Sequence, residues 1–227
     1  MSTETYDYII VGAGSAGATL ANRLSAQRSN RVLVLEAGQK SHPWSRIPVG
    51  FARLIDNPAA NWLYDSEPEE ATKGRRIPVP RGKLLGGSSA INGMVFVRGQ
   101  KQDYDTWSQL GNRGWSYADV LPLFKQMENY AGGDAEFRGR DGLLKVTDNK
   151  ESSPLYDALF AAGEQVGIKR NLDYNGADQE GFGRYQRTIH KGERWSASYG
   201  YLRPIVGVRD NLTVISTGMV TRVLIEN

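Results

Sequence analysis

The first forty residues alternate between short apolar runs and a segment rich in small residues. Apolar and β-branched residues dominate positions 6–12 ("YDYIIVG") and 31–38 ("RVLVLEAG"), a pattern typical of buried strands. Between them, "SAGATLANRLSAQ" spaces Leu20, Ala21 and Leu24 along one helical face. The pattern therefore predicts a strand–helix–strand unit over residues 6–38.

The later part of the chain is less regular. Frequent prolines over residues 39–80 predict long irregular segments. Helices are expected over residues 119–129, 153–166 and 196–202, and strands over 142–148, 211–217 and 219–227. The last two strands are separated only by the region of Gly218, as in a hairpin. Because exposed edge strands are usually covered, this ending favours further chain or a partner beyond residue 227.

Composition excludes several classes of protein. The chain has 227 residues, of which 40% are hydrophobic and 23% charged, as in ordinary globular proteins. It contains no apolar run long enough for a membrane span and no secretory signal, so a cytoplasmic location is expected. Its 28 basic and 25 acidic residues are interspersed, so nucleic acid is not an expected partner. Cysteine is absent, which excludes disulfides and thiolate metal ligands, and no metal site is expected.

A glycine motif follows the first predicted strand and opens the first helix. Gly12, Gly14 and Gly17 have G-x-G-x-x-G spacing, in which the glycines permit a tight turn, close approach of a pyrophosphate and close helix–strand packing. The phosphates would lie at the helix N-terminus. Glu36 ends the second strand, 19 residues after Gly17, where a carboxylate can bind an adenosine ribose and would repel a 2′-phosphate. The motif predicts a dinucleotide but does not distinguish NAD from FAD.

A second glycine-rich stretch, "RGKLLGGSSAING", occupies residues 81–93. It does not match a nucleotide-triphosphate loop, because Ile77 stands where that motif needs glycine and Leu84 where it needs serine or threonine. Scarce side chains instead indicate that the backbone itself meets a ligand.

This second stretch resembles the first signature of the glucose–methanol–choline (GMC) flavoprotein oxidoreductases. The matching positions are, in order, Gly82, Lys83, Leu85, Gly86, Gly87, Ser88, Ser89, Ile91, Asn92, Phe96, Gly99 and Asp105. The resemblance extends over nearly the whole chain, through "DYIIVGAGSAG", "WSYADVLPLFK", "RWSASYGYLRP" and "NLTVIST". It is greatest for the choline and alcohol dehydrogenase branch.

The resemblance implies an α/β fold in which a Rossmann-like, doubly wound FAD-binding domain carries inserted, less regular substrate-side segments. Residues 1–227 would form the N-terminal part of this domain, with its βαβ core at 6–38, its signature at 81–105 and strands at 211–226. Substrate-side segments would lie within about 39–80 and 130–205. The C-terminal catalytic part is absent from this sequence, so the domain is expected to be incomplete without further chain.

The implied cofactor is FAD. Family positions for adenosine and phosphates are occupied here by Gly12, Gly14, Ser15, Ala16, Gly17 and Glu36, and those for the ribityl and flavin by Leu84, Gly87, Ser88, Asn92, Gly93, Met94 and Val95. Val220 matches a position beside the adenine, although an ordinary core strand residue is the alternative. Ile91 stands where some relatives carry the histidine that binds FAD covalently, so non-covalent FAD is expected. Trp62 and Tyr64 are candidates for the substrate entrance, with simple packing as the alternative.

The family's reaction is oxidation of an alcohol by hydride transfer to flavin N5, assisted by a histidine pair. His42 and His190 lie in no matching motif, and the second family signature is absent. No catalytic residue is therefore assigned. The expected partners are a small-molecule alcohol, choline-like, aliphatic or aryl, and a second polypeptide that carries the C-terminal half.

Three alternatives remain open at this stage. An NAD-dependent Rossmann dehydrogenase would leave residues 81–93 without a role. A non-catalytic flavin-binding fragment would be stable without a partner. Half of a GMC-fold photodecarboxylase acting on fatty acids would share all of these motifs, because the pocket residues that separate the chemistries lie outside this sequence.

Overall fold

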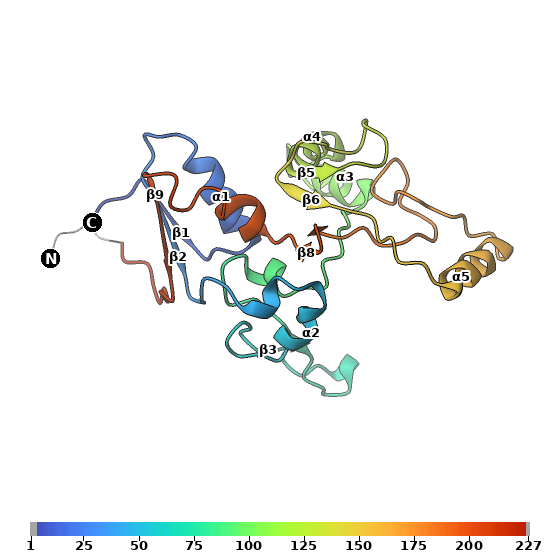
Figure 1. Cartoon of the computed structure of the whole chain (residues 1–227), viewed down its shortest axis with the longest axis horizontal. Helices are drawn as coiled ribbons and strands as arrows, with labels where there is room; N and C mark the ends of the chain where they lie inside the picture. Colours follow the sequence, from blue (N-terminus) through green and yellow to red (C-terminus); the bar gives the residue numbers. More distant parts are fainter. Residues whose placement is uncertain (1–3, 226–227) are drawn as a thin grey trace. The chain divides into compact units, whose positions relative to one another are not determined.

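The computed structural model describes residues 4–225, which belong to two compact units (Figure 1). The first, here called the sheet unit, comprises Met1–Met94 and Lys191–Asn227. The second, the middle unit, comprises Val95–His190. Within the described residues, no helix is both long enough and apolar enough to cross a bilayer.

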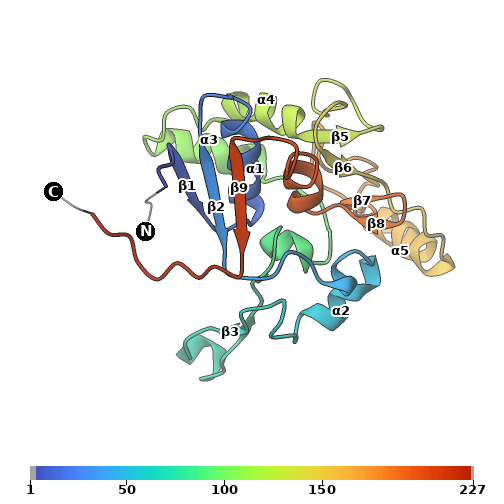
Figure 2. The ribbon, with the colours of Figure 1, turned by 60° about the vertical axis from the view of Figure 1, so that its left-hand side comes forward.

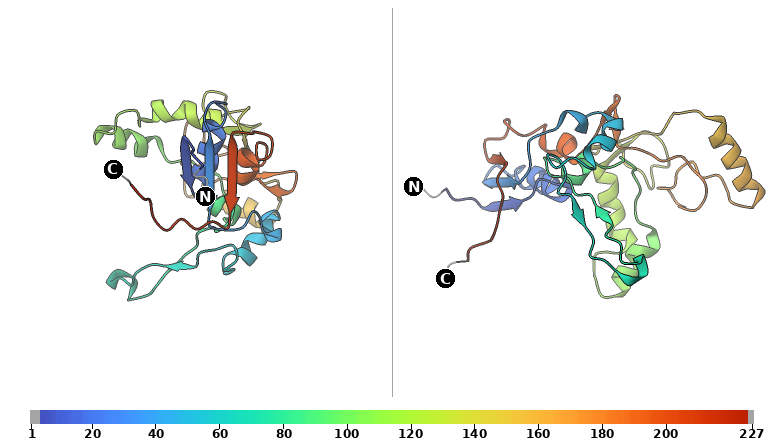
Figure 3. Two further views of the ribbon diagram at one scale, coloured as in Figure 1. Left: turned by 90° about the vertical axis from the view of Figure 1, so that its left-hand side faces the viewer. Right: turned by 90° about the horizontal axis from the view of Figure 1, so that it is seen from below.

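Three parallel strands form the centre of the sheet unit. They are β1 (Tyr8–Val11), β2 (Val32–Glu36) and β9 (Leu212–Ser216), in the order β1-β2-β9. The strands lie side by side in Figure 2 and in the left view of Figure 3. β2 is almost entirely buried because it pairs on both sides, which explains its continuous apolar run. The strands expected near residues 6–12, 31–38 and 211–217 are confirmed.

The second C-terminal strand expected over residues 219–227 is wrong for the residues that are described. β9 pairs in parallel with β2, and residues 217–225 form no strand. The chain leaves the line of β9 at Thr217, whose φ is 62°, while the N–H of Gly218 donates to the carbonyl of Glu36 at 2.9 Å. Val223 and Ile225 are then exposed, because no described strand lies beside them. Residues 226 and 227 lie outside the described part of the chain.

Helix α1 (Ser15–Leu24) connects β1 to β2, as the sequence pattern predicts. It packs closely because Gly17 has no side chain: a Cβ there would lie 1.9 Å from the carbonyl oxygen of Gly12. The π-helical turn η5 (Ser198–Leu202) lies against α1 and is held by Asn22, whose Nδ2 donates to the carbonyl of Tyr201 at 2.8 Å. This turn replaces the longer helix expected over 196–202.

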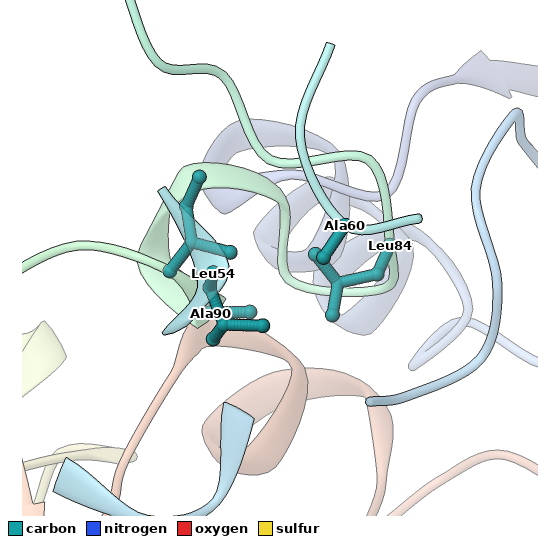
Figure 4. Close-up of a cluster of buried hydrophobic side chains, with 5 residues drawn as sticks. Leu54, Ala60, Leu84 and Ala90 are labelled. Atoms are coloured by element: carbon teal, nitrogen blue, oxygen red, sulfur yellow. The ribbon is translucent and has the colours of Figure 1, made fainter. Parts of the chain in front are cut away.

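Residues 39–94 of the sheet unit contain only short elements, in agreement with the irregular segment expected over 39–80. They are η1 (Pro43–Ser45), η2 (Pro48–Gly50), α2 (Phe51–Leu54), β3 (Tyr64–Asp65), η3 (Glu70–Thr72), β4 (Pro78–Val79) and η4 (Gly87–Ala90). A cluster of buried apolar side chains joins residues 54–60 of this segment to residues 84–91, which lie after β4 (Figure 4). Its members are Leu54, Ala60, Leu84, Ala90 and Ile91. Burial of this cluster anchors the second glycine-rich stretch to the sheet unit.

The middle unit contains three helices and short strands among the described residues. They are α3 (Lys101–Gln109), α4 (Tyr117–Met127), β5 (Glu128–Tyr130), β6 (Leu144–Val146), α5 (Pro154–Gln165) and β7 (Ile189–His190). α4 and α5 confirm the helices expected over 119–129 and 153–166. α4 ends earlier than expected because its last predicted residues form β5, which pairs in parallel with β6. α3 was not expected, because Tyr104 and Trp107 are its only large apolar residues.

Buried charged side chains of the middle unit pair with one another. One oxygen of Glu128 accepts a hydrogen bond from Arg98 Nη2 at 2.6 Å, and the other accepts one from Arg138 Nε at 2.8 Å. Arg138 also bonds to Asp173 through Nη1. The side chains of Glu128 and Arg138 are fully buried. These four residues are called the buried ion cluster below.

Candidate functional site

The two glycine-rich loops of the sheet unit meet backbone to backbone. The N–H of Gly86 donates to the carbonyl of Ala13 at 2.8 Å. A Cβ on Gly87 would lie 2.7 Å from Gly14 Cα, closer than side-chain atoms approach one another, and the φ of Gly87 is +52°. Both the contact and the left-handed conformation therefore favour glycine. Because the loops touch, the two motifs contribute to a single site.

The N-terminus of α1 opens into this site. Gly14 occupies the N-cap position and provides no side-chain cap, and the first intrahelical bond runs from Ala18 N–H to Gly14 O at 2.9 Å. The N–H groups at the start of an α-helix have no intrahelical acceptor, and the helix dipole favours negative charge there. Ser15 and Ala16, in this first turn, are exposed. The turn can therefore bind an anionic group such as a phosphate.

A cavity of about 230 Å³ lies beside the glycine contact. Five of the residues expected in a cofactor site line it: Gly12, Gly14, Glu36, Gly87 and Val220. Ligand pockets commonly measure roughly 300–1,000 Å³, so this cavity suits one part of an extended ligand rather than a whole dinucleotide.

Glu36 is fixed at the carboxyl end of β2. Its side chain is buried, with one oxygen accepting from Ala13 N–H and the other from Gly38 N–H, each at 2.8 Å. A carboxylate has about four acceptor positions, so each oxygen can accept a further hydrogen bond from a ligand hydroxyl. The carboxylate therefore both shapes the first glycine loop and provides acceptors at the cavity.

Trp62 forms part of the cavity wall, whereas the sequence predicts for it only a substrate entrance or simple packing. The β3–β4 hairpin brings it there, because Trp62 N–H donates to Arg81 O at 2.9 Å. Its ring stacks on Tyr64 with centroids 5.8 Å apart, and Lys83 Nζ lies 4.6 Å from its centroid. No local motif marks this residue, since its position depends on a pairing with the second glycine-rich stretch.

The remaining expected residues lie outside the cavity lining. Gly17 is buried in α1, while Leu84 and Met94 have buried side chains. Ser88 accepts a hydrogen bond from Gly82 N–H through its Oγ at 3.1 Å, and Asn92 and Gly93 are exposed on the loop that follows. Val95 belongs to the middle unit, so its expected part in the site stays a prediction.

Neither histidine is placed as an obvious acid–base catalyst. His42 caps η1: its Nδ1 accepts from Trp44 N–H at 3.3 Å, and its Nε2 lies 3.4 Å from Asn57 Nδ2. His190 lies in β7 of the middle unit. Among residues 4–225, no group of three or more histidine and acidic side chains is arranged to hold a metal ion.

Comparisons with known proteins agree with these motifs. The family model described as GMC oxidoreductase matches residues 6–227. Two oxygen-dependent choline dehydrogenases are among the similar proteins. The one from Rhizobium etli is 48% identical over 222 residues, which are 97% of this chain and 40% of that protein. The one from Brucella melitensis is 45% identical over 221 residues, with the same coverage.

Solved structures of oxidoreductases are similar to this chain over nearly its whole length. Pyridoxine 4-oxidase from Mesorbium loti has a TM-score of 0.88 and 33% identity, over 94% of this chain and 42% of that one. An FAD-dependent oxidoreductase from Chaetomium thermophilum has a TM-score of 0.83 and 28% identity, over 93% of this chain and 38% of that one. The expected α/β fold class is thereby confirmed.

The chain spans about 40% of the length of the curated relatives it matches. A family model that covers residues 6–227, together with these relatives, confirms the recognition made from the signature residues. The chain belongs to the GMC oxidoreductase family and represents an N-terminal portion of such a protein.

Proposed function

We propose that this chain supplies most of the FAD site of an oxidoreductase that acts on a small-molecule alcohol. The observation that supports this most directly is the contact of Gly14 with Gly87 beside the cavity that Glu36 lines. A Cβ on Gly87 would fill the space between the two glycine loops. The adjoining N-terminus of α1 is suited to bind a phosphate. When bound, FAD would supply the acceptor, at flavin N5, for the two electrons that the alcohol loses.

Each part of the cofactor has residues that suit it. The first turn of α1, from Ser15 to Gly17, would bind the diphosphate through N–H groups, and Glu36 would accept from the adenosine ribose. Val220 and Trp62 would flank the adenine. The loop from Ser88 to Val95 would meet the ribityl and flavin. These roles are a proposal that rests on the cavity lining, on exposure and on the matched motif positions.

The proposed binding is non-covalent. Ile91 has a buried aliphatic side chain, which offers no nucleophile to the flavin. The choline dehydrogenases among the relatives favour choline or a similar alcohol as the substrate. The cytoplasmic location and the division into an FAD core with substrate-side segments within about 39–80 and 130–205 stay predictions.

The open sheet supports a further polypeptide that completes the protein. β1 lies at one edge of the described three-stranded sheet, and its Ile9 and Val11 are 59% and 60% exposed. Unpaired strand edges, and exposed apolar side chains on a sheet face such as Ile9 and Val11, are normally covered. We therefore propose that the C-terminal half, whether a separate polypeptide or a continuation of this one, completes the sheet and supplies the acid–base residues.

Native mass spectrometry of the purified protein tests the proposed function, because it weighs bound FAD and any partner chain together. A complex of this chain, one FAD and a second polypeptide, with turnover of choline, is the expected result. FAD on the chain alone, without turnover, would favour a non-catalytic flavin-binding fragment. Turnover of a fatty acid under light would favour the photodecarboxylase alternative. Absence of FAD both from the chain and from the completed protein would contradict the proposal.

We expect a Trp62→Ala variant to bind FAD about tenfold more weakly, because it removes an aromatic surface from the cavity wall. Titration of apoprotein completed with its C-terminal half, followed by flavin fluorescence, gives the dissociation constant. Trp44→Ala is the matched control, since Trp44 lies outside the cavity lining, beneath Arg53. Equal FAD affinity in the Trp62→Ala variant and the wild type would show that the ring does not contact the cofactor.

A further inference from the structure

Arg194 lies in the short strand β8 (Glu193–Arg194) of the sheet unit, and its side chain is fully buried. One nitrogen, Nη1, donates to three oxygens of the second glycine-rich stretch. These are Ser89 O at 3.2 Å, Asn92 O at 2.6 Å and Asn92 Oδ1 at 2.9 Å. The guanidinium therefore holds the end of the signature loop from the protein interior.

The charge of Arg194 has no counter-ion among residues 4–225: the ion pairs found there do not include it. Its Nε and Nη2 are buried without a hydrogen-bond partner. Burial lowers the pKa of Arg194 to about 10, which still leaves the group protonated at neutral pH. In contrast, Arg98 and Arg138 of the middle unit share the carboxylate of Glu128. A buried cation without an anion is unfavourable, so negative charge that develops close to Arg194 is stabilised.

The loop that Arg194 holds is an exposed turn in an uncommon conformation. Asn92 Oδ1 accepts a hydrogen bond from Met94 N–H at 3.0 Å. Met94 has a φ of 63°, in the left-handed region of the backbone that residues other than glycine rarely adopt. Asn92 itself is exposed. A second attachment joins Ala197 N–H to Ser89 Oγ at 2.9 Å. β8 and the segment that follows it are therefore bonded to the loop at two points, through Arg194 and Ala197, which fixes the groups that the loop presents outward.

We propose that Arg194 is a positioning residue for the flavin. It holds the turn from Asn92 to Met94 in its left-handed conformation, and it places an uncompensated positive charge behind that turn. Because two-electron reduction makes flavin more negative, this charge favours the reduced cofactor over the oxidised one. The inference rests on the proposed function, since the turn meets a flavin only if FAD binds there.

Three variants of the completed protein separate position from charge. Arg194→Met removes the donors and the charge, and Arg194→Lys keeps the charge but loses the guanidinium geometry. Asn92→Asp keeps the shape of the side chain but adds a negative charge beside Arg194, which offsets the positive charge of the guanidinium. Arg46→Met is the control, because Arg46 is exposed and pairs with Glu193, next to Arg194 in the sequence.

Hydrogen exchange measures the positioning role without any cofactor. Amides of residues 92–94 are expected to exchange at least tenfold faster in Arg194→Met and Arg194→Lys, whereas Asn92→Asp and Arg46→Met exchange as the wild type does. Unchanged exchange in both Arg194 variants would overturn the positioning role. If Arg194→Met does not fold, Arg194→Lys provides the same comparison.

The flavin midpoint potential measures the effect of the charge. Arg194→Met and Asn92→Asp are expected to lower the ratio of affinities for reduced and oxidised FAD about tenfold, which corresponds to about 30 mV for a two-electron couple. Arg194→Lys and Arg46→Met are expected to keep the wild-type potential. An unchanged potential in Asn92→Asp would overturn the electrostatic role. If the wild type binds no FAD, the proposed function fails and the electrostatic role with it, while hydrogen exchange still decides the positioning role.

Discussion

A Gly87→Ala variant is expected to bind FAD at least a hundredfold more weakly than the wild type. The new Cβ would lie 2.7 Å from Gly14 Cα, and its three nearest atoms all belong to the backbone of Gly14 rather than to a mobile side chain. One glycine loop must therefore shift. A displacement of about 1 Å at a precisely formed catalytic site can lower the reaction rate about a hundredfold, and we expect a loss of at least this size in FAD affinity. Flavin titration of the completed protein measures the loss. Circular dichroism checks that the variant still folds.

The matched control for this variant is Gly74→Ala. Gly74 has a φ of +68°, similar in strain to the +52° of Gly87, but a Cβ there would meet no atom within 4 Å. Each alanine is expected to destabilise the protein by about 1 kcal/mol through its backbone conformation. Only Gly87→Ala is expected to affect FAD. Equal FAD affinity in both variants would mean that the contact between the glycine loops does not shape the cofactor site.

Local patterns were sufficient to predict the βαβ unit and both glycine motifs. The apolar runs, the small residues of α1 and the position of Glu36 all act over fewer than forty residues. Val34, for example, is buried on a strand that pairs on both sides, as its apolar neighbours predict. Residues close in sequence carry enough information to define such a unit.

Long-range pairings account for most of what the sequence did not reveal. Trp62 reaches the cavity through its hydrogen bond to Arg81, beside the bridge of Asn61 to Gly82, and Arg194 reaches Asn92 across 102 positions. The apolar and β-branched residues after Gly218 are typical of a strand, but no described strand lies beside them. Such a run shows that a segment can pair, whereas the partner strand that decides the outcome lies elsewhere in the fold.

The buried ion cluster of the middle unit gives the second large effect. A Glu128→Gln variant is expected to lower the free energy of unfolding by about 3–5 kcal/mol, because it leaves Arg98 without its carboxylate and Arg138 with only Asp173. Urea titration measures the total loss. Exchange of the β5 amides shows whether it arises in the middle unit. Asp178→Asn is the control in the same unit: its pair with Lys169 is exposed, and no measurable change is expected.

Glu128→Gln could lower the stability either through unbalanced charge or through lost hydrogen bonds. The two causes predict different free energies of unfolding when the other residues of the cluster are changed as well. Replacing Arg98, Glu128 and Arg138 by Met, Leu and Met, and Asp173 by Asn, removes all four charges of the cluster but keeps similar side-chain volume. If unbalanced charge causes the loss, this quadruple variant should recover most of the stability that Glu128→Gln loses, because apolar groups can replace a buried ion cluster at little cost. A quadruple variant as unstable as Glu128→Gln would show that the hydrogen bonds of the arginines, including Arg98 to Phe137 O at 2.7 Å, stabilise the unit. The cluster would then define the fold of the middle unit through its geometry rather than through its charge.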